Sequence, residues 1–262
     1  MTRLALLAGL IGCALLAPGA ADAATWNTLS GAAPKIIAHR GLPADLPENS
    51  LPGYAEAMRR GADLLETDVH LTSDGVVVLM HDDSLARTTN IATLSAFAGR
   101  ENDPISSFTA AEIATLKLKT ADGTGVTDAG VPTLDEFLDL VNDFNAANGT
   151  DVGVLVELKG PANTAMVDAT VASLIDKGFD TPKKGQVQAF DTGNVDLLAL
   201  ADLDATTADL FVAQLGFEDA PAPPDDTLII TQVTFDMTGA PSPNDQDTLS
   251  ALASQTDAIA MF

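Results

Sequence analysis

The sequence is poor in cysteine, histidine and basic residues. Its 262 residues include one cysteine, three histidines and 13 lysines and arginines, against 37 aspartates and glutamates. These numbers exclude a disulfide framework and a finger-type zinc site, which need more cysteine and histidine ligands. Nucleic acids and anionic membrane surfaces bind clustered basic residues, so a net charge of −24 argues against both as partners.

The first 23 residues have the composition of a bacterial export signal. Arg3 precedes an apolar run over residues 4–17, which is too short to span a bilayer, and the small-residue triplet Ala21-Asp22-Ala23 follows. Cleavage after this triplet predicts a periplasmic or secreted protein without a transmembrane segment. Residues 10–13 also resemble a lipoprotein cleavage box, which leaves a lipoprotein anchored at Cys13 as the lesser alternative.

Residues 24–262 are predicted to form one domain with alternating strands and helices. Strand-like runs at 36–38, 64–69, 154–158, 186–190, 208–213, 228–233 and 257–262 alternate with helix-length segments at 49–60, 133–144, 162–177, 193–202 and 245–254. This alternation is typical of a parallel sheet with right-handed crossovers. Because no Gly-x-Gly-x-x-Gly follows the first strand, a barrel is favoured over a dinucleotide-binding fold. A composition shift over 83–132 indicates an insertion.

One strand pair is predicted to be a hairpin. Asp74-Gly75 lies between β-forming residues, which is a strong hairpin signal. If these two residues form the turn, Asp68 lies opposite His81, and Glu66 shares a face with Asp68 because strand side chains alternate. A register slip of one residue would turn His81 to the other face.

Charged side chains follow every strand in the first half of the chain. They are His39 and Arg40 after the first run, Glu66 and Asp68 in the second, His81 after the hairpin, and Glu157 and Lys159 at the third. The carboxyl ends of strands hold the active site in a parallel α/β barrel. Each residue alone has an ordinary structural explanation, such as a surface ion pair. Their joint placement argues for a catalytic site.

The residue types in this group are complementary. The carboxylates of Glu66, Asp68 and Glu157 are hard oxygen donors that suit Ca²⁺ or Mg²⁺. Arg40 and Lys159 suit a phosphate group, and His39 and His81 can exchange protons near neutral pH. We therefore expect in-line displacement at a phosphodiester, with one histidine taking a proton from the nucleophile and the other protonating the leaving alkoxide.

The sequence resembles the glycerophosphodiester phosphodiesterase family. The resemblance is carried by the segments HRG (39–41), PENS (47–50), GADLLETDV (61–69), TSDG (72–75), VLMHD (78–82), LARTT (85–89), PTLDE (132–136) and ELK (157–159). It implies a TIM-type (β/α)8 barrel that hydrolyses glycerophosphodiesters to sn-glycerol 3-phosphate and an alcohol. His39 and His81 would then be the acid/base pair, Arg40 and Lys159 the phosphate contacts, and the three carboxylates the metal ligands. Exported members of the family resemble Ca²⁺ enzymes, so the export signal favours Ca²⁺ over Mg²⁺.

The second half of the chain departs from the family pattern. Residues 258–262 resemble the sixth strand of the family, and two later strands are not visible in the sequence. We therefore expect a truncated barrel with missing C-terminal strands. The alternative is that residues 228–233 form a barrel strand and a partner chain covers the gap.

Two other functions compete with this interpretation. A phospholipase D-like enzyme acting on lysolipids or sphingomyelin would use the same chemistry, with Phe97 and Phe108 of the insertion contributing to an apolar docking surface. A catalytically incompetent, truncated Ca²⁺-binding relative would bind metal without turnover.

Overall fold

The computed structural model describes residues 35–160, 164–181 and 184–190, together with strands at 211–216, 228–231 and 258–261. The predicted export signal, with Cys13, and the helices predicted at 193–202 and 245–254 lie outside the described residues. Within the described part of the chain, no helix has the length and hydrophobicity needed to cross a membrane.

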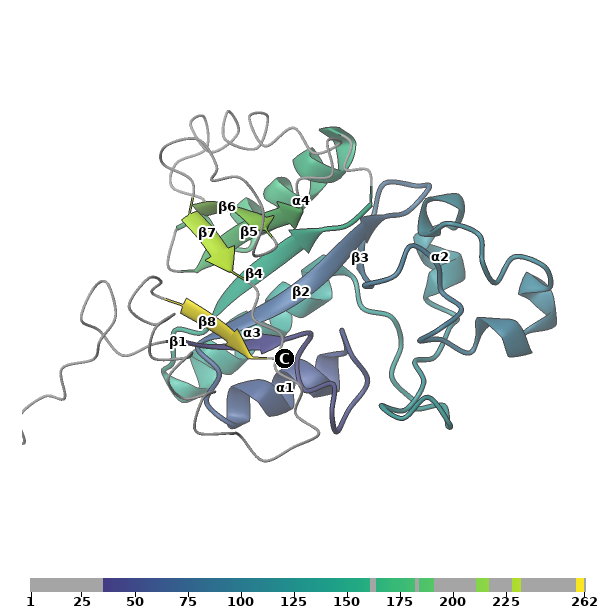
Figure 1. The fold of residues 1–262 in the computed structure, drawn as a ribbon, viewed down its shortest axis with the longest axis horizontal. Helices are drawn as coiled ribbons and strands as arrows, with labels where there is room; N and C mark the ends of the chain where they lie inside the picture. The colour runs from purple at the N-terminus through teal and green to yellow at the C-terminus, as the bar shows by residue number, and fades with distance from the viewer. Residues whose placement is uncertain are drawn as a thin grey trace, which may run out of the picture.

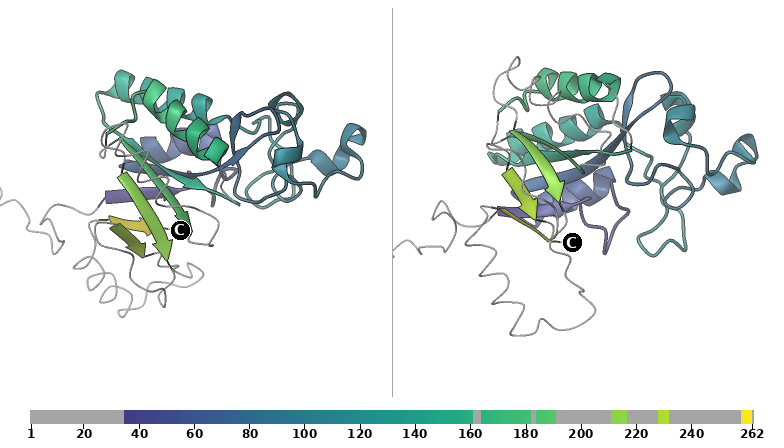
Figure 2. Two further views of the ribbon diagram at one scale, coloured as in Figure 1. Left: turned by 90° about the horizontal axis from the view of Figure 1, so that it is seen from above. Right: turned by 45° about the horizontal axis from the view of Figure 1, so that its top comes forward.

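Seven parallel strands form the centre of the molecule (Figures 1 and 2). They are β1 (Lys35–His39), β2 (Leu64–Leu71), β4 (Gly153–Leu158), β5 (Gly185–Phe190), β6 (Phe211–Gly216), β7 (Leu228–Thr231) and β8 (Ala258–Met261). Their order is β7-β6-β5-β4-β2-β1-β8, and every neighbouring pair is parallel. The edge strands β7 and β8 approach within 8 Å, Cα to Cα, but no ladder joins them among the described residues.

The position of the last strand differs from the sequence-based expectation. Residues 258–261 were expected to be the sixth strand of the barrel, but β8 pairs with the outer edge of β1, with Lys35 opposite Ala258 and Ala38 opposite Met261. The sixth position belongs to β7, which pairs with β6. An unpaired edge of β1 would leave its backbone groups without partners, and β8 satisfies them. Residues 228–231 are therefore a strand of this sheet. The preceding strand, β6, begins at Phe211, three residues later than the predicted start at 208.

Three helices cover the outer face of the sheet: α1 (Leu51–Arg59), α3 (Leu134–Asn148) and α4 (Thr164–Asp176) (Figure 1). The side chain of Ser50 caps α1, and Thr133 with Glu136 forms a capping box at the start of α3. The core between strands and helices includes Tyr54 and Phe137, whose rings lie 4.4 Å apart.

Alternation along the strands decides which side chains face the site. Leu65 and Val69 of β2 and Val154, Val156 and Leu158 of β4 pack in the core against the helices. The residues that alternate with them must point to the opposite face, which is the inside of the barrel. Those residues include the carboxylates of β2 and β4.

The predicted hairpin forms, but its register is wrong by one residue. Strand β3 (Val77–Leu79) pairs antiparallel with β2, with Val69 opposite Leu79, so Asp68 lies opposite Met80 and not His81. The connection is a three-residue loop over residues 73–75. Thr72 and Val76 close it, because the backbone N of Val76 donates a hydrogen bond to the side-chain oxygen of Thr72 at 2.9 Å. Gly75 takes the left-handed conformation that such a loop requires, with φ of 83°.

Residues 83–132 have a small core of their own. They contain η1 (Ile91–Thr93), η2 (Ser95–Phe97), η3 (Ile105–Ser107) and α2 (Ala110–Ile113). The buried side chains of this segment, among them Phe108 and Leu116, pack with Val78 and Met80 of the hairpin. Figure 1 shows the segment beyond the carboxyl ends of β2 and β4, at the same end of the sheet as the site.

Candidate active site

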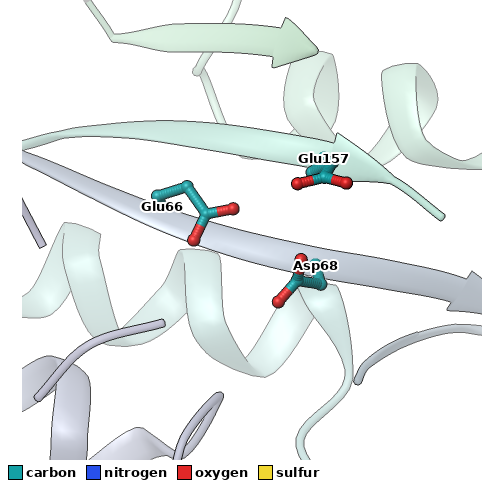
Figure 3. A group of neighbouring side chains, drawn as sticks. All are labelled: Glu66, Asp68 and Glu157. Atoms are coloured by element: carbon teal, nitrogen blue, oxygen red, sulfur yellow. The ribbon is translucent and has the colours of Figure 1, made fainter. Parts of the chain in front are cut away.

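Three buried carboxylates meet inside the barrel (Figure 3). Glu66 and Asp68 lie two residues apart on β2, and Glu157 of β4 pairs in register with Asp68. One carboxylate oxygen from each side chain lies within 4.8 Å of those of the other two. The three residues are 2%, 0% and 4% exposed. The structure thus brings together the carboxylates predicted as metal ligands.

The electrostatics of this triad are unfavourable without a cation. Burial, and then the charges of Asp68 and Glu157, raise the pKa of Glu66 well above its ordinary value. Burial and Asp68 also raise the pKa of Glu157. Burial acts in the same direction on Asp68, but Lys159 and Arg40 outweigh it and lower the pKa of this carboxyl.

The oxygen atoms of the triad are suited to a divalent cation. Glu66 Oε1 is buried and accepts no hydrogen bond from the described residues, and Asp68 Oδ1 is buried with an ion-pair contact to Lys159 Nζ at 3.3 Å. An unsatisfied buried oxygen is costly, whereas a hard cation coordinates such oxygens directly. The residues present therefore fit one divalent cation.

The two predicted phosphate contacts flank the triad. Arg40 Nε lies 3.2 Å from Asp68 Oδ2, and Lys159 Nζ lies 3.3 Å from Asp68 Oδ1 and 2.6 Å from Glu157 Oε1. The charges of Asp68 and Glu157 overcome the effect of burial and raise the pKa of Lys159. Lys159 therefore stays charged beside the carboxylates.

The loop after β1 holds Arg40 in an uncommon backbone conformation. Its φ is 55°, in the left-handed region, and the following Gly41 has φ of 89°. The backbone N–H of Arg40 donates to Glu66 Oε2 at 3.0 Å and to the carbonyl of Glu66 at 3.1 Å. Contacts that compensate such strain are common at functional sites.

The two predicted catalytic histidines lie at the edge of this cluster. His39 Nε2 is 3.8 Å from Glu66 Oε2, and burial, followed by the Arg40 charge, lowers the pKa of His39 to about 3. His81 Nδ1 is 2.9 Å from Asp82 Oδ1. Met80, which precedes His81, donates from its backbone N to the carbonyl of Asp68 at 3.0 Å, so His81 directly follows the residue opposite Asp68. Six of the seven predicted site residues therefore contact one another at the carboxyl ends of β1, β2 and β4, and His81 follows the adjoining strand β3.

Three polar residues of the site escaped prediction. Asn49 donates to Asp68 Oδ2 at 2.8 Å while accepting from the Tyr54 hydroxyl at 2.6 Å, which fixes the orientation of Asp68. His70 follows Asp68 on the same face of β2, and its Nε2 is 3.5 Å from the carbonyl of His81. Gln188 of β5 pairs in register with Glu157 and is 4% exposed, and its Oε1 accepts no hydrogen bond from the described residues. The period-two alternation that placed Glu66 beside Asp68 could have identified His70.

Comparisons with known proteins point to one family. A sequence model of the glycerophosphoryl diester phosphodiesterase family matches residues 39–251. The glycerophosphodiester phosphodiesterase of Caldanaerobacter subterraneus is 36% identical over 108 residues, 41% of this chain and 40% of that protein. The Bacillus subtilis protein YhdW, assigned to the same activity, is 32% identical over 155 residues, 59% of this chain and 56% of that protein. The chain thus spans about half the length of these curated relatives.

Two solved structures assigned to the same activity share the fold. A chain from Silicibacter pomeroyi superposes with a TM-score of 0.66 at 22% identity, covering 87% of this chain and 89% of the other. A chain from Galdieria sulphuraria superposes with a TM-score of 0.63 at 19% identity, covering 87% and 94%. The predicted TIM-type α/β barrel is confirmed by this likeness and by the parallel strand order.

Proposed function

The chain belongs to the glycerophosphoryl diester phosphodiesterase family, and from this premise we propose that it hydrolyses glycerophosphodiesters to sn-glycerol 3-phosphate and an alcohol. The observation that carries the proposal is the convergence of the buried carboxylate triad, Arg40, Lys159 and His39 at one end of the sheet, with His81 directly after the hairpin strand that pairs with β2. The predicted export signal supports action in the periplasm or outside the cell.

The triad would hold one divalent cation, and we favour Ca²⁺ over Mg²⁺. Glu66, Asp68 and Glu157 supply oxygens that suit either ion. A bound divalent cation supplies Lewis-acid stabilisation of the charge on the phosphoryl oxygens. Arg40 and Lys159 flank the same carboxylates and would bind the anionic oxygens of the phosphodiester.

The histidines would move the protons. One of His39 and His81 would take a proton from the nucleophile that attacks phosphorus, and the other would give a proton to the alkoxide that leaves. Net hydrolysis consumes one water: its oxygen ends on phosphorus as the P–O bond to the alkoxide breaks, and the proton lost by the nucleophile is matched by the one gained by the alcohol. Arg40 and Lys159 hold the phosphate so that the attacking and leaving oxygens stay in line.

The structure weakens the phospholipase D-like alternative. An enzyme acting on lysolipids or sphingomyelin needs an exposed apolar surface near the site. The two insertion residues considered for that surface, Phe97 and Phe108, are 6% and 0% exposed and belong to the core of residues 83–132. The remaining alternative, a Ca²⁺-binding relative without activity, shares the triad and is separated by a turnover assay.

The test is hydrolysis of glycerophosphocholine by the chain starting at Ala24. We expect release of glycerol 3-phosphate that EDTA abolishes and added Ca²⁺ restores better than Mg²⁺. His39→Ala and His81→Ala should each lower kcat by roughly 10²- to 10⁴-fold, the usual contribution of acid–base catalysis. Metal binding without turnover would favour the inactive relative, and faster turnover of micellar lysolipid would favour the phospholipase D-like enzyme.

A further inference from the structure

A charged network outside the triad connects His81 to the insertion. Arg87, which follows the hairpin, donates to Asp82 from Nε at 2.6 Å and from Nη2 at 2.8 Å. The same guanidinium donates to Glu48 from Nη1 at 2.8 Å and from Nη2 at 2.7 Å. Glu48 lies 39 residues earlier, in the loop after β1 that carries Arg40. A single planar side chain thus holds two carboxylates from different segments.

Asp82 in turn sets the protonation pattern of the His81 ring. Asp82 Oδ1 lies 2.9 Å from His81 Nδ1. Hydrogen bonds from Arg87 are the largest cause that lowers the pKa of Asp82, to about 2, so this carboxylate is ionised and can only accept. The hydrogen at this contact must therefore lie on Nδ1. In the neutral ring, Nε2 is then the nitrogen with a free lone pair.

We propose that Arg87 is a positioning residue of the reaction: by holding Asp82 against Nδ1, it fixes His81 in the Nδ1–H tautomer and leaves Nε2 to exchange the proton with the substrate. This inference rests on the proposed function for the catalytic part of His81. It assigns the role of each ring nitrogen, and it gives the insertion a part in the chemistry.

A purely structural role for these ion pairs would have a different consequence. Arg87 is 49% exposed at its side chain, and exposed ion pairs contribute little stability, typically below about 1 kcal/mol. Loss of Arg87 should therefore change the melting temperature little, whereas it should release Asp82 and the His81 ring. The four hydrogen bonds use the fork of the guanidinium, which a lysine ammonium cannot reproduce.

The experiment compares Arg87→Met and Arg87→Lys with the wild-type chain, with Arg100→Met as the matched control. Arg100 lies in the same insertion and also pairs with two carboxylates, Glu112 and Asp103, but it is part of no contact with His81. We expect Arg87→Met to lower kcat for glycerophosphocholine by roughly 10- to 100-fold, the usual effect of removing an orienting partner, with KM changed less than about twofold. Arg40 Nη1 lies 3.6 Å from Glu48, so the change also loosens one neighbour of Arg40. Arg40 nevertheless keeps its contact with Asp68 at 3.2 Å, so KM should change less than kcat. Arg87→Lys should restore only part of the loss.

The second readout is the tautomer of His81 in the free chain, measured by ¹⁵N NMR and assigned with His81→Gln. Wild type and Arg100→Met should show the Nδ1–H form, and Arg87→Met should show a mixture with the Nε2–H form. An Nε2–H tautomer in the wild type, or equal kcat losses in Arg87→Met and Arg100→Met, would overturn the inference. A wild-type chain that does not turn over substrate would refute the proposed function instead, and the tautomer would still decide whether Arg87 orients His81.

Discussion

Replacing Glu66 by glutamine should change thermal stability in opposite directions with and without a divalent cation. Two carboxylates whose oxygens lie within 4.8 Å of each other repel by at least about 3.5 kcal/mol at an effective dielectric constant near 20. Arg40 and Lys159 offset part of this repulsion, so we expect the metal-free Glu66→Gln variant to be more stable by roughly 1–2 kcal/mol. The amide oxygen can still accept the hydrogen bond from Arg40 N, which keeps the loop after β1 in place.

The wild-type chain should gain stability from the cation instead. A ligand present at a hundred times its dissociation constant stabilises the folded state by about 2.7 kcal/mol. For a domain of this size, that corresponds to a rise in Tm of roughly 5–10 °C. Glu66→Gln removes a charged ligand, so its Tm should respond little to the same cation concentration.

Thermal melts of both chains in EDTA and in excess Ca²⁺ or Mg²⁺ measure the two effects together. Asp139→Asn is the matched control, because this carboxylate is exposed and, within the described part of the chain, pairs with Lys177 alone. Its metal response should equal that of the wild type. A metal-free Glu66→Gln chain that melts below the wild type would show that the carboxylates of the triad are not strained. A variant that keeps the full metal response would show that Glu66 is not part of the cation site.

Three further outcomes follow from the same geometry. Gly41→Ala should destabilise the folded chain by roughly 2–3 kcal/mol, because its Cβ would lie 3.0 Å from Gly53 C at a φ of 89°. Gly99→Ala is the control: Gly99 has a similar φ but no atom near the new Cβ, so the change should cost about 1 kcal/mol in denaturant melts. Asn49→Leu should destabilise by about 2 kcal/mol and weaken Ca²⁺ binding in calorimetry, since Asp68 and Tyr54 lose their buried partner; unchanged affinity would contradict its orienting role. The pKa of Asp82 is lowered to about 2 from 3.8, so its ion pairs stabilise the chain above pH 4 and are lost as the pH falls toward 2. The Tm difference between the wild-type chain and Asp82→Asn should therefore shrink over that pH range. A constant difference would contradict the assignment.

The parts of the fold that follow local rules could be predicted from the sequence. The apolar runs of β2 and β4 are buried on both faces, so they stand out in composition, and their alternation correctly placed Glu66 and Asp68 together. The hairpin register could not be predicted from Asp74-Gly75 alone. It depends on the side-chain hydrogen bond of Thr72 to the backbone, which lengthens the loop by one residue.

The supporting residues of the site depend on contacts between distant segments. Asn49 meets Asp68 across 19 residues, and Glu48 meets Arg87 across 39. The periodicity of a single segment cannot link residues so far apart in the sequence. Glu48, Asn49 and Arg87 were therefore noticed only as members of the segments that resemble the family, without a predicted role. The same holds for β8, whose partner β1 lies at the other end of the chain.

The charge within the site explains how a strongly acidic protein can bind an anionic substrate. The triad carries three carboxylates, and among the described residues Arg40 and Lys159 contact it as charged cations, while His39, with its pKa lowered to about 3, is neutral; this leaves one net negative charge when the carboxylates are ionised. With a divalent cation in place, the balance becomes one net positive charge. A phosphodiester anion is repelled by the first arrangement and attracted by the second. On the proposed function, cation and substrate binding would therefore be coupled through the same buried carboxylates, and neither Arg40 nor Lys159 would replace the cation in this balance.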